Sequence, residues 1–68
     1  MSQMYILYSA KTNISLWTTS KSDEVIKYIT GEDLNNYYIK VIESETNLIK
    51  QYSGYEFMLK YKKEDVVY

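Results

Sequence analysis

The chain contains neither cysteine nor histidine, and it has only 68 residues from which to build a stable fold. A domain of this size buries only about 60% of the surface that its unfolded chain exposes. Small domains commonly compensate with disulfides, a structural metal or a partner chain. Because the side chains that form disulfides and zinc sites are missing, we expect a single small domain over residues 1–68, with a tight core and self-association as a homodimer.

The same absences narrow the chemistry that the chain can perform. Without histidine it has no imidazole base and no Ser-His-Asp triad, and without cysteine it has no thiolate nucleophile. Gly31 and Gly54 are the only glycines, too few for a phosphate-binding loop or a dinucleotide fingerprint. We therefore expect a protein that is not an enzyme and that uses no cofactor and no metal.

Charge and hydropathy bear on partners and location. The formal net charge is −1, with eight lysines and no arginine, whereas a dedicated DNA-binding domain is usually clearly basic. No apolar stretch approaches the roughly 18 residues of a membrane span, and the first residues lack the pattern of a signal peptide. These patterns predict a soluble, cytoplasmic protein that does not act at a membrane.

Residues 4–9 and 14–19 are rich in aromatic and branched side chains and predict a first hairpin. The turn between them ends in Asn13, a residue type that tolerates left-handed backbone. A two- or four-residue loop would set Leu7 opposite Leu16 and Ile6 opposite Trp17. One face of this hairpin would then carry four large apolar side chains: Met4, Ile6, Tyr8 and Trp17.

The segment that follows predicts a helix of about three turns. Ser20 or Ser22 can cap it, and Gly31 suits the position after its last turn. Its apolar stripe consists of Val25, Ile26 and Ile29.

A second hairpin is predicted around the turn at residues 44–47, which repeats the Thr-Asn-aliphatic pattern of the first turn. Residues 37–42 and 48–52 form its strands, with Tyr38, Lys40 and Ile42 on one face.

Beyond Gly54, apolar and polar side chains alternate strictly, which predicts a further half-buried strand whose apolar face belongs to the core. That face holds Tyr55, Phe57, Leu59 and Tyr61. Residues 66–68 either add a last short strand or lie loose at the end of the chain. A helix within residues 45–63, which contain no proline, is the competing interpretation.

Together these elements predict an α+β fold: an antiparallel sheet of about five strands, in the order ββαβββ, with one helix packed on a face. The tyrosine-rich first strand, the strand ending in Trp17-Thr18-Thr19-Ser20, the Ser-capped helix and the Tyr-Tyr-Ile-Lys-Val run form a ββαβ layout over residues 4–43. This layout resembles small accessory proteins of phages and prophages of low-GC bacteria. The resemblance implies a protein that acts on a component of the host cell.

Tyrosine is the most over-represented residue, with nine copies in addition to Trp17 and Phe57. A short helix on a small sheet cannot enclose so many rings, so we expect an aromatic surface that binds another chain. Coding bias toward AT-rich codons is an alternative source of the tyrosines. The expected partner is a host protein, which binding would inhibit or modulate, and the expected contact residues are Trp17, Tyr8, Tyr5 and Ile6.

A second surface mixes rings with lysines: Tyr38, Lys40, Lys50 and Tyr52 can share one face of the sheet. Aromatic rings flanked by cations are typical of platforms for single-stranded nucleic acid. Nucleic-acid binding through these four residues is therefore the alternative function. A structural or assembly protein that adds strands edge to edge is a third interpretation.

Overall fold

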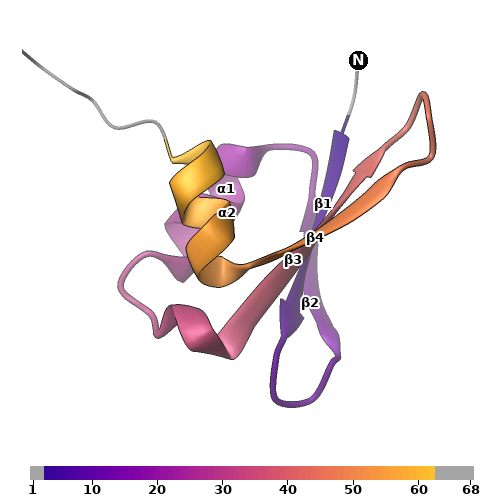
Figure 1. Ribbon diagram of the computed structural model, residues 1–68. Coiled ribbons are helices and arrows are strands. Elements are labelled where there is room, and N and C mark those ends of the chain that lie inside the picture. Colours follow the sequence, from indigo (N-terminus) through magenta and orange to yellow (C-terminus); the bar gives the residue numbers. More distant parts are fainter. Residues whose placement is uncertain (1–2, 63–68) are drawn as a thin grey trace, which may run out of the picture.

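The computed structural model describes residues 3–62 and places them in two layers, one sheet and a set of helices on one of its faces (Figure 1). All neighbouring strands are antiparallel, in the order β2-β1-β3-β4. The predicted α+β class with an antiparallel sheet is confirmed, with four strands in the described residues rather than about five. The strands are β1 (Gln3–Ser9), β2 (Ser15–Thr19), β3 (Tyr37–Glu43) and β4 (Ile49–Ser53).

The two hairpin turns have the same backbone geometry, as their shared sequence pattern predicts. Asn13 and Asn47 both adopt left-handed backbone, with φ angles of 58° and 56°. In each turn the last residue of the first strand donates its N–H to the carbonyl of the residue after the asparagine. These bonds run from Ser9 to Ile14 at 3.0 Å and from Glu43 to Leu48 at 2.9 Å.

The register of the first hairpin differs from the predicted one. Leu7 lies opposite Trp17, whereas Tyr8 lies opposite Ser15, so the pairing skips Leu16. This β-bulge adds one residue to β2 and turns every side chain beyond it to the other face. The predicted pairs of Leu7 with Leu16 and of Ile6 with Trp17 are therefore wrong.

The helix predicted after β2 is confirmed as α1 (Ser22–Ile29), but its start is not capped by a serine. The N-cap position is Lys21, without a side-chain cap bond. Instead, the Thr19 hydroxyl accepts the Lys21 N–H at 3.2 Å and donates to the Glu24 carboxylate. A threonine before the helix thus performs the anchoring expected of Ser20 or Ser22.

The predicted strand beyond Gly54 is wrong, because residues 54–61 form the helix α2 (Gly54–Tyr61). A complete capping box starts it: the Ser53 hydroxyl accepts the Glu56 N–H at 3.0 Å, and the Glu56 carboxylate accepts the Ser53 N–H at 3.1 Å. This reciprocal pair is a strong helix-start signal. The competing helical interpretation is correct for this segment alone, and the predicted strand at residues 66–68 lies outside the described residues.

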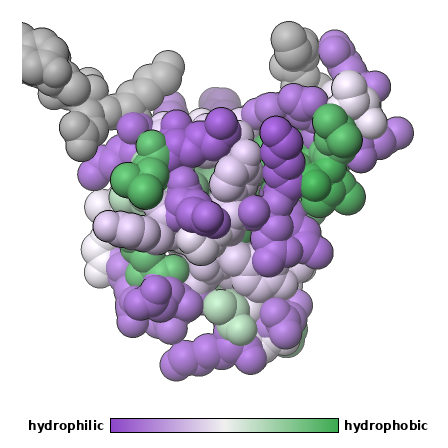
Figure 2. Space-filling view, in the orientation of Figure 1, coloured by the Kyte–Doolittle hydropathy of each residue, from purple (hydrophilic) through white to green (hydrophobic). Residues whose placement is uncertain are grey.

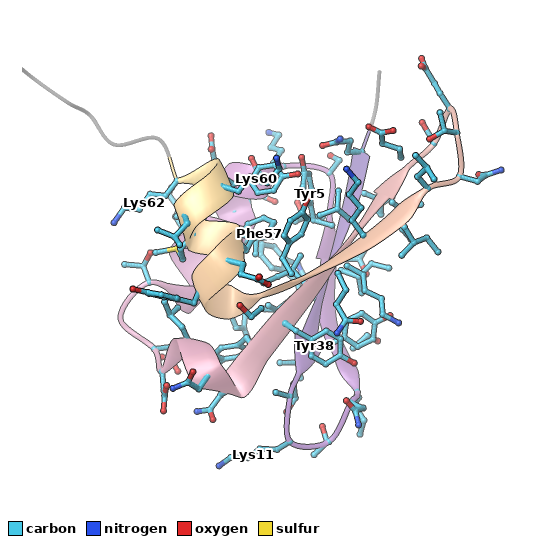
Figure 3. The ribbon with its side chains drawn as sticks, viewed as in Figure 1. Tyr5, Lys11, Tyr38, Phe57, Lys60 and Lys62 are labelled. Atoms are coloured by element: carbon cyan, nitrogen blue, oxygen red, sulfur yellow. The ribbon has the colours of Figure 1, made fainter. Side chains whose placement is uncertain are left out.

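The core lies between the sheet and the two helices. Phe57 of α2 is fully buried, and Figure 3 shows it beside Tyr5 in the space between helix and sheet. The ring centroids of Phe57 lie 5.9 Å from Tyr5, 6.4 Å from Tyr52 and 4.5 Å from Tyr61. The buried residues are Tyr5, Leu7, Val25, Ile29, Ile39, Val41 and Phe57.

The start of α2 is held against the single turn of 3-10 helix η1 (Leu34–Asn36), which precedes β3. A Cβ atom on Gly54 would lie 2.6 Å from the carbonyl oxygen of Leu34, closer than real contacts allow. Glycine is therefore required at this position for close approach, and the approach sets the angle at which α2 returns onto the sheet.

Substitutions of Phe57 and Leu59 distinguish the helix from the predicted strand, which would place both side chains on one face. We expect Phe57→Ala to reduce the free energy of unfolding by about 3–5 kcal/mol, because it removes a fully buried ring. Leu59→Ala, at a side chain 73% exposed, should change it by less than about 0.5 kcal/mol. Urea unfolding measures both, and equal losses would contradict the helix.

Candidate interaction surface

One face of the sheet is covered by the helices, and no element within residues 3–62 covers the other (Figure 1). Side chains alternate between the two faces of a strand, so the neighbours of the buried Leu7 and Ile39 point away from the helices. We call this second surface the open face. Its residues are Met4, Ile6, Tyr8, Ser15, Thr18, Tyr38, Lys40, Ile42, Ile49, Gln51 and Ser53.

The open face is largely apolar. Met4 is 42% exposed and Ile49 is 60% exposed, while Ile42 between them and Ile6 beside Lys40 are half-buried. Figure 2 shows one group of apolar side chains on the right-hand side of the molecule, near the β3–β4 hairpin, and other groups on the left. A contiguous apolar surface rimmed by polar residues is typical of a protein interaction site.

A pair of tyrosines forms the aromatic part of the open face. Tyr8 and Tyr38 lie opposite each other on β1 and β3, with ring centroids 4.9 Å apart and ring planes at 1°. The Nζ atom of Lys40 lies 5.0 Å from the centroid of Tyr8, and the Tyr38 hydroxyl donates to the Asn13 side chain at 3.3 Å. Figure 3 shows Tyr38 on the side of the sheet opposite α2. These contacts hold the rings and the cation in place before any partner arrives.

The structure brings together only two of the four predicted protein-contact residues. Tyr8 and Ile6 lie on the open face, but Tyr5 is a core residue with 6% of its surface exposed. Trp17 lies on the helix side, where its ring stacks on Tyr28 of α1 at 5.6 Å. The expectation that Trp17 shares a face with Ile6 and Tyr8 is therefore wrong, because the bulge in β2 reverses its direction.

The predicted tyrosine–lysine surface is also divided between two faces. Tyr38 and Lys40 lie on the open face, but Tyr52 lies opposite Ile39 and Lys50 lies opposite Val41, which places both on the helix side. The expectation that these four residues share a face is wrong. The partnership of Tyr38 with Tyr8 was missed, because nothing in the local sequence indicates that β1 pairs with β3.

A small cavity of about 160 Å³ lies on the helix side, between the β4 end of the sheet and α2. Gln3 in its lining donates to the Glu43 carboxylate at 3.3 Å and accepts a bond from the Tyr5 hydroxyl, outside the lining, at 2.6 Å. Burial raises the pKa of Tyr61 at this cavity from 10.0 to about 12, with a further contribution from the nearby Tyr52 phenol. The full lining is Gln3, Val41, Glu43, Leu48, Lys50, Tyr52, Lys60 and Tyr61.

Two kinds of functional feature are not found in the part of the chain that the structure describes. Residues 3–62 contain no group of three or more acidic side chains that could hold a metal ion. None of their helices is long and apolar enough to cross a membrane. No protein-family model, no curated protein and no solved structure gives a significant match to this chain.

The raised pKa of Tyr61 predicts how stability changes at high pH. Below pH 10 this phenol is neutral in both the folded and the unfolded state, so its full contribution to the free energy of unfolding is present. Between pH 10 and about 12 the unfolded chain ionises first, and the free energy of unfolding falls. We expect Tyr61→Phe to lose less stability over this range than the wild type, measured by urea unfolding at each pH. Tyr55→Phe, at a ring 63% exposed, is the matched control, and an equal benefit from both would contradict the assignment.

Proposed function

We propose that this protein is a non-enzymatic interaction protein that binds another protein through its open face. The observation that carries the proposal is the sheet face that no element of residues 3–62 covers, on which the stacked pair of Tyr8 and Tyr38 lies next to Ile6 and Lys40. Tyrosine and methionine are enriched in protein interfaces, and their large, preorganised contact area limits the entropy lost on binding. A flat, largely apolar face with a fixed aromatic pair at one end suits a partner with a flat apolar surface.

The charge of the open face specifies the partner further. Lys40 is the only charged side chain among the described residues of this face. Its ammonium group lies against the ring of Tyr8 and becomes desolvated when a partner covers the face. A buried charge is costly unless it is paired. The partner should therefore present a carboxylate opposite Lys40, surrounded by apolar side chains.

A protein partner is favoured over single-stranded nucleic acid by the same distribution of charge. Nucleic-acid platforms line the path of the phosphates with several cations. Here Lys50 faces the helix side, so that Lys40 stands alone beside the two stacked rings. Ile6, opposite Lys40 on β1, and Ile42, two residues along β3, offer apolar contact but no bond to a phosphate.

The resemblance of residues 4–43 to phage and prophage accessory proteins supports a host protein as the partner. Binding that occupies a surface needs no catalytic group on the binding protein. The proposed consequence is inhibition or modulation of that host protein through occupation of its surface.

Variants of the open face test this proposal. We expect Lys40→Glu to weaken partner capture most strongly, because it sets a carboxylate against the acidic group of the partner. Ile6→Thr keeps a β-branched side chain and removes apolar contact, so it should weaken capture less. Quantitative pull-down from host lysate, followed by calorimetric titration with each protein captured, measures both effects.

The matched control is Leu59→Gln, which changes an apolar side chain 73% exposed on α2, away from the open face. The proposal predicts a partner that Leu59→Gln retains and Lys40→Glu loses, with thermal unfolding confirming that each variant is folded. Equal capture by all variants contradicts it. Salt-sensitive binding of oligonucleotides that requires Lys40 would favour nucleic acid instead.

A further inference from the structure

The two edges of the sheet differ in regularity. β2 forms one edge and carries the bulge at Leu16, a device that interrupts pairing with another strand. β4 forms the other edge, and its register with β3 continues without a break from Ile49 to Ser53. Within residues 3–62, each copy of this chain therefore has one regular edge without a neighbouring strand.

The hydrogen bonds of β3 and β4 show which groups of β4 point away from the sheet. The Glu43 N–H donates to the Leu48 carbonyl, so this pair is hydrogen-bonded. Bonded and non-bonded pairs alternate along an antiparallel ladder, which places Ile49, Gln51 and Ser53 in the non-bonded pairs. The Ser53 N–H agrees with this alternation of bonded and non-bonded pairs, because it is directed to the Glu56 carboxylate rather than to β3.

We infer that β4 pairs antiparallel with β4 of a second copy, about a two-fold axis through Gln51, and joins the two sheets into one. In this register the N–H and carbonyl of Gln51 bond those of Gln51 in the second copy. The N–H and the carbonyl of Ser53 stay within the first turn of α2, so both capping boxes remain intact. The outward-pointing backbone groups of Gln51 in each copy thus become bonding partners of the other.

Side-chain chemistry selects this register. Residues directly opposite each other in an antiparallel pair of strands lie on the same face of the sheet. A two-fold axis that relates two identical strands must therefore set one residue directly opposite its own copy. An axis through Lys50 would set two lysines directly opposite, which is destabilising. An axis through Gln51 instead sets Lys50 opposite Tyr52 of the second copy, so that a cation lies beside an aromatic ring on the helix side. On the open face, the same axis sets the two Gln51 side-chain amides next to each other.

The pairing has two consequences. Because the β2 edge is bulged, the assembly closes as a dimer instead of growing into a fibre. Because the sheets become continuous, the two open faces adjoin and present two tyrosine pairs to a partner. The dimer itself does not depend on the function proposed above.

Proline at the edge tests the dimer by sedimentation equilibrium. Gln51→Pro removes an N–H that points to solvent in the monomer, so the fold should tolerate it. It also removes the bonds on the two-fold axis, and we expect the dimer dissociation constant to rise about tenfold or more. Thr18→Pro makes the same change at the β2 edge, opposite Ile6, and should leave the dimer unchanged.

Because the chain contains no cysteine, single cysteine substitutions test the register independently. Across the axis the two Gln51 Cα atoms would lie about 5.5 Å apart, within the range that a disulfide spans, so Gln51→Cys should cross-link on mild oxidation. The Lys50 Cα atoms would lie about 8 Å apart, beyond that range, so Lys50→Cys should not.

A wild-type chain that is only monomeric at high micromolar concentration overturns the inference, as does a dimer unaffected by Gln51→Pro. Cross-linking of Lys50→Cys without that of Gln51→Cys overturns the register. Lys40→Glu leaves the β4 edge intact, so a variant that stays dimeric but loses its partner separates the dimer from the proposed function. Partner capture by a purely monomeric chain would leave that function standing and remove the dimer alone.

Discussion

The insertion of Phe57 between the rings of Tyr5, Tyr52 and Tyr61 is the contact on which the rest of this structure depends. A chain of 68 residues without cysteine or histidine has few means to stabilise a fold other than such packing. The ring belongs to α2, which is the second of two short helices on one side of the sheet. Its capping box and the close approach of Gly54 to Leu34 fix the helix so that Phe57 enters the core.

Both helices pack on one face to close this core, and no element of residues 3–62 covers the opposite side of the sheet. The apolar side chains there, and the stacked rings of Tyr8 and Tyr38, follow from the period of two in β1 and β3. In the same described residues, β4 has only β3 as a neighbour and forms a regular edge of the sheet. The proposed binding face and the proposed dimer edge are thus two consequences of a core that uses only one face of the sheet.

The sequence predicted the features that local patterns determine. Asn13 and Asn47 indicated both turns, and the alternation in β3 placed Ile39 and Val41 on one face and Lys40 on the other. The side to which Trp17 points was not predictable from the pattern, because one bulged residue reverses a strand without changing its composition. The pairing of Tyr8 with Tyr38 was missed because it joins distant parts of the chain. Alternation around Phe57 indicated a strand, although the Ser53–Glu56 capping box was visible in the sequence.

The central claim is that residues 3–62 cover the sheet on one face only, and the isoleucine methyl groups test it most directly. NMR spectra with a soluble paramagnetic agent, recorded below the concentration at which the chain associates, measure how far solvent reaches each methyl. The account predicts strong broadening for Ile6, Ile42 and Ile49 on the open face and little for Ile29 and Ile39 in the core. Equal protection of Ile6 and Ile39 would mean that a second layer covers the open face, which contradicts the account.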